Sequence, residues 1–311
     1  MPALVDLLLH EAPAQVVPLD IKHRTTWADL EGKLRASGDL EGSLADTSLS
    51  PELDSIFTDI IASAVRGLDE RAISEIVLSD RPTTYGRLFA YILANNKIVE
   101  VITTNYDRII EASISKDGLR LDSMFYGHSV GHLDSSHSRD ELLIKRIRGT
   151  RGQVRLEYHP AIRLAKPHGS LDWYEIDDRL ISTNYPLARA PKVVTPGGDK
   201  YIKGYDVLYS KHRNRANAAI DKAAALLVIG YGFNDNHLQT NLKIQMSKVP
   251  SVLLTKSLTA NAHEFLKLHP DSVAIEDDNQ AGAYILHAGQ RLRSPLPLWQ
   301  LDTFMTEILK S

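Results

Sequence analysis

From residue 98 onward, short apolar runs suited to buried strands alternate with longer helical or polar segments. Runs of five or six such residues are typical of strands covered on both faces, and the segments between them are long enough to connect parallel strands. The alternation predicts an α/β fold, with a mostly parallel sheet and helices on both faces. The runs are IVEVIT (98–103), IRLAKP (162–167), KVVTP (192–196), LLVIG (226–230) and SVLLT (251–255).

The residues before position 98 have a different pattern. LDSIFTDIIASAV (53–65) and YGRLFAYILA (85–94) repeat apolar residues at three- and four-residue spacing, which indicates amphipathic helices. We therefore expect residues 1–97 to form a mainly helical N-terminal part, joined to a core at 98–311 in one continuous domain. Two segments richer in Gly, Ser, His, Asp and Pro are interpreted as long connections or a small insertion, namely 116–160 and 175–200.

Composition excludes several classes of protein. The formal charge is −3 and the pI about 6.5, so there is no basic excess to indicate nucleic-acid binding. The absence of cysteine excludes disulfides, a Cys-ligated zinc site and a Cys nucleophile. The N-terminal residues do not resemble a signal peptide, and the longest apolar run, AAALLVIG (223–230), is too short to span a bilayer. These features predict a soluble, cytoplasmic protein with no membrane partner.

Three of the predicted strands end on polar residues that chemistry could use. Asn105 and Asp107 follow the first strand, His168 follows the second, and Asn234 and Asp235 follow the LLVIG run. Because ligands of open parallel sheets bind outside the carboxyl ends of the strands, these side chains are expected to surround one ligand.

Each motif also has a purely structural interpretation. Asn105 and Asp107 could cap the helix that comes after them, and Asp235 could cap a helix that runs through Met246. His168, placed before Gly-Ser, could be a turn histidine. The GYG sequence after LLVIG favours a ligand more strongly, because glycines let the backbone approach a phosphate or sugar closely.

Taken together, TTNYD, KPHGSLDWY and GYGFNDNHLQ, in that order, resemble the sirtuin-like NAD-binding family. They are most similar to its bacterial branch found in antiphage defence systems, and TPGGDKY (195–201) fits that branch as well. The resemblance covers roughly residues 98–285 and implies a Rossmann-like sheet.

The resemblance implies an NAD+ hydrolase that cleaves NAD+ to nicotinamide and ADP-ribose. It assigns Asn105 to the nicotinamide ribose and the attacking water, Asp107 to the nicotinamide pocket, and His168 to the catalytic histidine near the ribose hydroxyls. It also implies a set of NAD+-binding residues: Thr104, Gly169, Ser170, Gly230, Tyr231, Gly232, Asn234 and Asp235.

Two departures from the family pattern leave alternatives open. Deacylating sirtuins carry a Cys-ligated zinc module after the HG turn, whereas this chain continues LDWYEIDD without cysteine, which favours water as the ribose acceptor and predicts no zinc. The family also opens with a strand and a Gly-rich phosphate loop, which residues 1–97 lack, although LEGKLRASGDLEGSLA resembles the segment that normally comes after that loop. Either the start site lies further upstream, or the phosphate cradle comes from elsewhere, or catalysis has been lost.

Stand-alone proteins of this kind resemble a subunit that assembles with a HerA-type ATPase or translocase, which implies such a partner and a large homo-oligomer. The alternative function is a non-catalytic nucleotide-binding scaffold of the same kind of complex, and protein deacylation ranks third for want of cysteine. His128, His132 and His137 are interpreted as part of a polar loop rather than as metal ligands, and Trp173-Tyr174 as closing the core behind His168.

Overall fold

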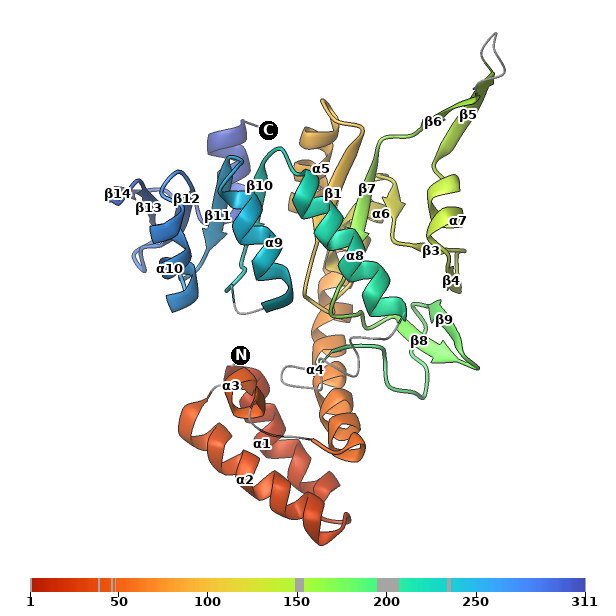
Figure 1. Ribbon diagram of the computed structural model, residues 1–311, viewed down its shortest axis with the longest axis vertical. Helices are drawn as coiled ribbons and strands as arrows, with labels where there is room; N and C mark the ends of the chain where they lie inside the picture. The colour runs from red at the N-terminus through yellow and green to blue at the C-terminus, as the bar shows by residue number, and fades with distance from the viewer. Residues whose placement is uncertain are drawn as a thin grey trace. The chain divides into compact units, whose positions relative to one another are not determined.

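The computed structural model describes residues 2–38, 40–45, 47, 49–148, 154–194, 207–233 and 236–310. These residues fall into two compact units, each formed from two stretches of chain. Unit 1 comprises Met1–Thr83 and Asn96–Arg213, and unit 2 comprises Thr84–Asn95 and Asn214–Ser311 (Figure 1). The chain re-enters unit 1 at Asn96, so the helices before Thr83 and the residues from Asn96 to Arg213 belong to the same unit.

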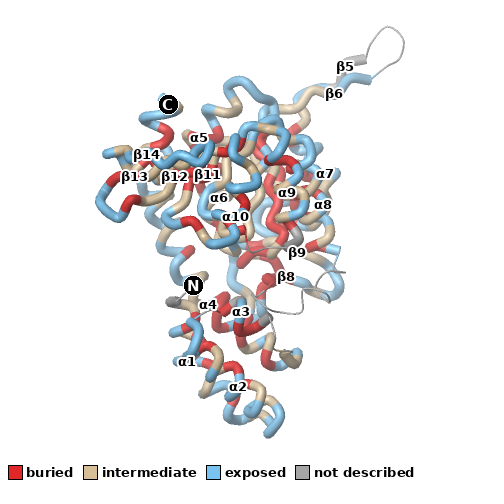
Figure 2. The backbone as a smooth tube through the Cα atoms, turned by 60° about the vertical axis from the view of Figure 1, so that its left-hand side comes forward, coloured by how far each residue is buried: buried red, intermediate tan, exposed pale blue. Residues whose placement is uncertain are grey.

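Unit 1 begins with a helical bundle that has its own core. Trp27 and Phe57 pack edge to face, with ring centroids 5.6 Å apart, among buried leucines and isoleucines. Figure 2 shows buried and exposed residues alternating along α1 and α2, as expected for helices with one side in a core. The Asp20 and Ser50 side chains cap α2 and α4 by accepting backbone N–H groups. The helices are α1 (Pro2–Val16), α2 (Ile21–Ser37), α3 (Leu40–Ala45) and α4 (Pro51–Leu78).

A parallel three-stranded sheet, flanked by helices, comes next in unit 1 in the order β1-β7-β2. Its central strand is almost fully buried and apolar except at the half-buried Arg163, which forms an ion pair with Glu100 of β1 at 2.6 Å. The α/β fold with parallel strands and a helical N-terminal segment is therefore confirmed. The elements are β1 (Ile98–Ile102), β2 (Leu121–Asp122), β7 (Ala161–Ala165) and α6 (Ile109–Lys116).

The segments interpreted as connections or an insertion contain short antiparallel elements. Strands β3, β4, β9 and β8 form one small sheet, and β5 pairs with β6 in a hairpin that extends away from the rest of unit 1 (Figure 1). The elements are β3 (Phe125–Tyr126), β4 (Gly131–Leu133), α7 (Ser135–Asp140), β5 (Leu143–Arg148), β6 (Val154–Tyr158), β8 (Trp173–Ile176) and β9 (Arg179–Ser182).

The prediction of a strand at 192–196 is wrong for the described residues, 192–194. Within 192–194 there is a single antiparallel bridge, between Val193 and Gly169, and residues 195–196 lie outside the described part. The Lys192 carbonyl accepts the Ser170 N–H and the Val194 N–H donates to the carbonyl of His168, while the Lys192 N–H donates to the carbonyl of Trp173 at the start of β8. Apolar character at Val193 and Val194 thus reflects packing under a loop.

Unit 2 is built on a five-stranded sheet in the order β10-β11-β12-β13-β14, parallel in its first three strands and antiparallel in the rest. Helix α5 belongs to it, since Thr84 and Arg87 both bond to the carboxylate of Asp302. Helix α8 (Val207–Lys222) carries the chain from unit 1 into unit 2. The other elements are α5 (Thr84–Leu93), β10 (Leu226–Ile229), α9 (Asn236–Met246), β11 (Ser251–Thr255), α10 (Ala260–Leu268), β12 (Val273–Asp277), β13 (Ala283–His287), β14 (Gln290–Ser294), α11 (Leu301–Phe304) and the π-helix η2 (Met305–Leu309).

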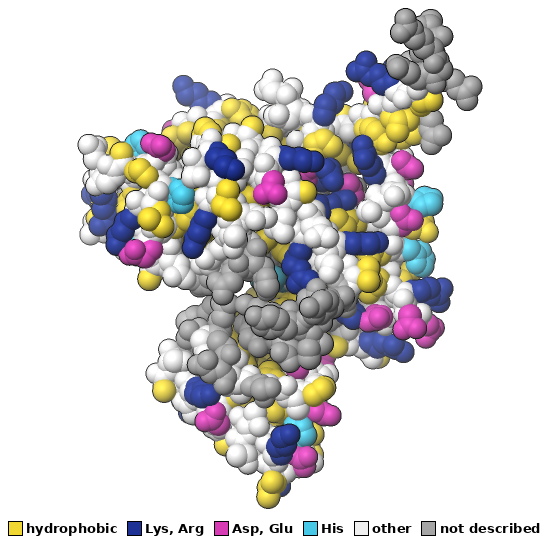
Figure 3. Space-filling view, in the orientation of Figure 1, with side chains coloured by type: hydrophobic (Ala, Val, Ile, Leu, Met, Phe, Trp, Pro, Cys, Tyr) yellow, Lys and Arg dark blue, Asp and Glu magenta, His cyan; other side chains and the backbone are white. Residues whose placement is uncertain are grey.

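Two surface properties bear on partners. On the face shown in Figure 3, the Lys and Arg side chains of the described residues are interspersed with Asp and Glu side chains. None of the helices in the described part of the chain is long and apolar enough to cross a membrane.

Candidate active site

The first two predicted strand ends lie side by side in unit 1. Strands β1 and β7 pair in parallel, and the last pair in register is Ile102 with Ala165. The Thr103 N–H extends this ladder by donating to the carbonyl of Ala165 at 3.0 Å. The loop that carries Asn105 and the turn that carries His168 therefore leave the same edge of the sheet from neighbouring positions.

Hydrogen bonds join this loop to this turn. The Leu171 N–H donates to the carbonyl of Tyr106 at 3.0 Å. The Tyr106 hydroxyl donates to the carbonyl of Val194, whose own N–H donates to the carbonyl of His168 at 2.8 Å. The structure thus brings the stretch from Asn105 to Asp107 and the turn at His168 to one place.

The predicted site residues in the loop and the turn differ in exposure and in their local hydrogen bonds. Asn105 is exposed, with its backbone N–H bonded to the Thr103 hydroxyl at 3.1 Å, whereas Thr104 and His168 are half-buried. Asp107 accepts the Ile109 N–H through Oδ1 at 3.2 Å, so its carboxylate does serve the first turn of α6. This local bond agrees with the structural interpretation considered from the sequence for Asp107.

Gly169 and Ser170, predicted to bind NAD+, build the turn itself. Gly169 has φ +89°, and a Cβ there would lie 2.0 Å from the carbonyl oxygen of Lys192, so only glycine fits. Ser170 is fully buried, and its hydroxyl bonds to Asp172 Oδ1 at 2.5 Å. Trp173 and Tyr174, at the start of β8, are buried as expected from the sequence.

Sequence reasoning missed a group of buried charges beneath these loops. The Lys166 ammonium is buried and donates to Glu111 Oε1 and Ser170 Oγ, at 2.9 Å each, and to the carbonyl of Asp107. Burial raises the pKa of Glu111, an effect that the neighbouring Lys166 opposes and Asp172 reinforces. The only signal in the sequence was a lysine directly after an apolar strand, which more often marks a solvated end.

A second missed pair fixes the start of α6. Asp69, on α4, is fully buried and accepts three N–H groups of Arg108, from the backbone, Nε and Nη2, at 2.6, 2.8 and 2.6 Å. Arg108 also donates to Asn184 Oδ1 at 3.2 Å. The bundle helix α4 is thereby tied to the residue directly after Asp107.

The third predicted strand end belongs to unit 2. Gly230 lies directly after β10 with φ +62° and donates its N–H to the carbonyl of Leu254 at 2.8 Å; a Cβ there would meet nothing within 4 Å. Tyr231 is half-buried, and the carbonyl of Gly232 accepts the Thr259 hydroxyl at 2.6 Å. Asn234 and Asp235, and all of TPGGDKY (195–201), lie outside the described residues.

Phe233 anchors this second loop. It is fully buried with φ +56°, and its ring stacks on that of Phe265 with centroids 4.7 Å apart. Its carbonyl accepts the side-chain amides of Gln239 and Asn261. The buried Phe233 therefore anchors the loop, while the space next to the Cα of Gly230 is unoccupied by protein atoms. This combination would allow a ligand to approach the backbone closely.

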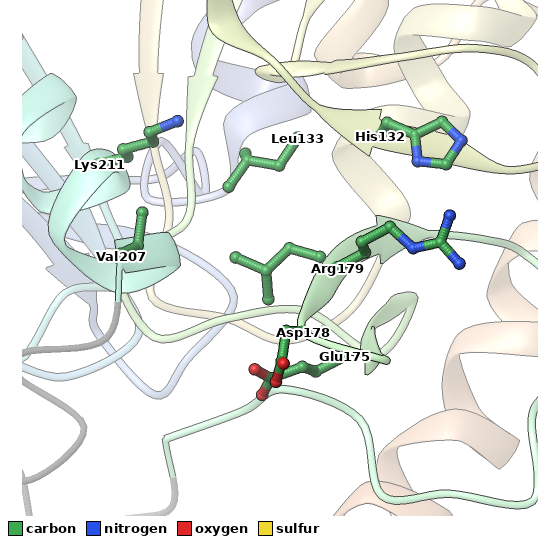
Figure 4. A pocket seen from close by; sticks show the side chains of 8 residues that line it. His132, Leu133, Glu175, Asp178, Arg179, Val207 and Lys211 are labelled. Carbon is green, nitrogen blue, oxygen red and sulfur yellow. The ribbon is translucent and has the colours of Figure 1, made fainter.

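Unit 1 also contains a groove of about 580 Å³ at different residues (Figure 4). Acidic Glu175 and Asp178 line it together with basic Arg179 and Lys211, so its charge favours no one sign. None of the side chains predicted for NAD+ is among its lining residues, which are His132, Leu133, Glu175, Asp178, Arg179, Leu180, Val207 and Lys211.

Of the three histidines of the predicted polar loop, His128 is exposed, and the other two make different contacts. His137 stacks on Tyr126, with ring centroids 4.6 Å apart, and bonds to Asp134 at 3.3 Å, while His132 lines the groove. Within the described ranges, no group of three or more His, Asp or Glu side chains is arranged to hold a metal ion.

The fold and these loops define an α/β protein with polar groups at the carboxyl ends of parallel strands, the place where nucleotides bind in such sheets. The sequence matches the SIR2-like domain over residues 99–262, more than half of the chain, and the chain belongs to that family. The matched region contains TTNYD, KPHGSLDWY and GYGFNDNHLQ, so the expected sirtuin-like family is confirmed. No curated protein matches the sequence.

Family membership gives the coarse function. SIR2-like domains bind NAD+, which indicates a function related to NAD+. Each unit has an accessible strand end of its own: in unit 1 Asn105 is exposed after β1, and in unit 2 a Cβ at Gly230, after β10, would meet nothing within 4 Å.

Proposed function

We propose that the protein is an NAD+ glycohydrolase that cleaves NAD+ to nicotinamide and ADP-ribose. The observation that carries the proposal is the pairing of β1 with β7, which puts Asn105 and His168 on two loops bonded to each other at one sheet edge. Both side chains are at least partly accessible there, unlike Ser170 and Lys166 in the same loops.

The reaction needs a positioned water and a base more than a strong acid. The bond between ribose C1′ and the nicotinamide nitrogen breaks with its electron pair going to nicotinamide, which leaves as a neutral molecule. Water bonds to C1′, oriented by the Asn105 amide, which can both donate and accept hydrogen bonds. His168, when neutral, accepts the proton that the water loses. The products are ADP-ribose, nicotinamide and that proton.

The residues after the HGS turn favour water over an acyl-lysine as the ribose acceptor. The chain lacks the cysteines of a zinc module, and these residues instead form β8, with Trp173 and Tyr174 buried. A protein deacylase therefore ranks last among the three candidate activities.

A non-catalytic nucleotide-binding scaffold is the alternative, and one observation favours it. In the described part of residues 1–97 there is no strand, and the glycines lie within helices or at a helix end rather than in a loop that could cradle a pyrophosphate. Gly38, for example, is the C-cap of α2. Two negative charges need backbone N–H donors or cations, so a chain without that loop would bind NAD+ weakly unless donors come from elsewhere.

We propose further that the enzyme acts in the cytoplasm in bacterial antiphage defence, as a large homo-oligomer controlled by a HerA-type ATPase. The support is the likeness of its three motifs to that branch of the family. In this setting, assembly with the ATPase would switch NAD+ hydrolysis on.

The test is nicotinamide release from NAD+ by the full chain, with and without a HerA-type ATPase, for wild type, Asn105→Ala and His168→Ala. Loss of a positioned polar group at such a site typically costs about 2.7–4 kcal/mol of barrier, or about 100- to 1,000-fold in turnover. The matched control is His10→Ala, an exposed histidine on α1, which should keep wild-type activity. Wild-type turnover in folded His168→Ala protein would refute the assignment. Binding of NAD+ by calorimetry without release, even with the ATPase, would establish the scaffold instead.

A further inference from the structure

The Lys166 ammonium lies where three separate pieces of unit 1 meet. It comes directly after β7, and its side chain is 1% exposed. Its three described acceptors are the carbonyl of Asp107 in the loop after β1, Oε1 of Glu111 in α6, and Oγ of Ser170 in the turn after β7. An ammonium has three N–H donors, so each donor has an acceptor.

Core stability does not require a charge at this position. Taking an ammonium out of water is costly, and apolar side chains of similar volume commonly replace a buried ion pair without loss of stability. What an ammonium adds is direction, because its donors fix where each acceptor can lie. The chain of hydrogen bonds continues beyond Ser170. The Ser170 hydroxyl donates to Asp172 Oδ1 at 2.5 Å, and Asp172 Oδ2 accepts the Ser182 hydroxyl.

Two of the acceptors are placed symmetrically about the proposed chemistry. Asp107 lies two residues after Asn105, and Ser170 lies two residues after His168. The ammonium thus bonds to both loops close to the side chain that each contributes, while lying too deep to contact a ligand itself.

We infer that Lys166 is a positioning residue, whose ammonium sets the distance and orientation between the loop that carries Asn105 and the turn that carries His168. The inference rests on the proposed function, since the reaction needs both side chains at one ribose. Lys166 should therefore affect the rate of bond cleavage rather than the affinity for NAD+, because the buried ammonium would not contact the nucleotide.

The test uses the full chain and the double variant Lys166→Met/Glu111→Gln, which removes both charges together so that neither is left buried alone. We expect it to melt close to wild type and to keep a KM for NAD+ within about threefold. Its kcat should fall on the order of 100-fold, the effect of a misplacement of about 1 Å in an active site. Glu111→Gln alone keeps the bonds of Lys166 to both loops and should retain most of kcat.

The matched control is Lys267→Met/Glu264→Gln, which removes an exposed Lys–Glu pair on α10 and should leave kcat and KM unchanged. A merely structural role for Lys166 would lower activity only in proportion to the fraction of folded protein. A folded Lys166→Met/Glu111→Gln protein with wild-type kcat, or with a raised KM and unchanged kcat, would overturn the inference.

A second measurement does not depend on turnover. Hydrogen exchange at the amides of Leu171 and Val194, which join the two loops, should be at least about tenfold faster in Lys166→Met/Glu111→Gln, with the amides of β11 unchanged. Unchanged exchange would overturn the inference whatever the activity. If wild type released no nicotinamide under any condition, the proposed function would fail, and faster exchange would still establish that Lys166 sets the loops.

Discussion

Replacing Asp69 with alanine would leave the buried guanidinium of Arg108 without its counter-charge. Asp69 is fully buried and accepts three N–H groups of Arg108 at 2.6–2.8 Å, one of them the backbone N–H at the start of α6. Removing one partner of such a pair costs about 3–5 kcal/mol, because the remaining charge stays out of water. We therefore expect Asp69→Ala to lose that much free energy of unfolding.

The measurement is urea unfolding monitored by tryptophan fluorescence, which reports on unit 1 through the buried Trp27 and Trp173. Asp69→Asn keeps the shape and a neutral acceptor, so its loss should be smaller than that of alanine. Glu264→Ala is the control, because Glu264 and its partner Lys267 are both exposed, and it should leave the midpoint unchanged. A loss below about 1 kcal/mol for Asp69→Ala would refute the reasoning, since it would mean that Arg108 reaches water without Asp69.

Three further predictions concern other residues of the two loops and their supports. Gly169→Ala should cost at least about 1–3 kcal/mol of stability in a thermal melt, because Gly169 has a positive φ and its added Cβ would clash with the Lys192 carbonyl. Gly67→Ala, at an exposed position in α4, is the control and should gain about 0.5–1 kcal/mol of stability. Equal changes in stability for the two variants would contradict the predicted strain at Gly169. Thr259→Val removes both the cap of α10 and the bond to Gly232, so calorimetry should find weaker NAD+ binding and a stability loss of about 1 kcal/mol; unchanged NAD+ affinity would count against a binding role for this loop. Because burial raises the pKa of Glu111 above 4.5, its contribution to stability is present below that pH and is lost as the pH rises through the raised value. Urea unfolding at pH values rising from 4.5 should therefore show wild type losing stability relative to Glu111→Gln, and parallel curves would exclude the effect.

The sequence predicted best the strands that form short, mostly apolar runs, because such runs between longer segments are typical of parallel strands with helices on both faces. The runs at 98–103, 162–167, 226–230 and 251–255 correspond to β1, β7, β10 and β11, with ends that differ by no more than two residues. Strands β13 and β14 were missed because half-exposed antiparallel strands, such as β14, carry many polar residues.

The sequence predicted the candidate site as a set of strand ends, and the structure shows why it could predict the exposed loops but not their buried partners. Parallel pairing of β1 with β7 is a matter of topology, and it places Asn105 and His168 at one edge as expected. The buried partners of the loops could not be predicted, because nothing local distinguishes Lys166 or Asp69 from a solvated charge. Apart from Ser170, which is four residues after Lys166, their acceptors and donors lie 39 to 59 residues away in the chain. The catalytic assignments stay predictions until the variants are measured.

The division of each unit between two stretches of chain has a consequence for biosynthesis. Helix α5 leaves the ribosome early, yet the side chain that holds it, Asp302, lies 215 residues beyond Arg87. When synthesis has reached Arg213, every residue of unit 1 has been made, while α5 still has none of the strands of unit 2 to pack against. An apolar face on α5 must therefore wait through most of translation, and a nascent chain stalled at that point would offer it to chaperones.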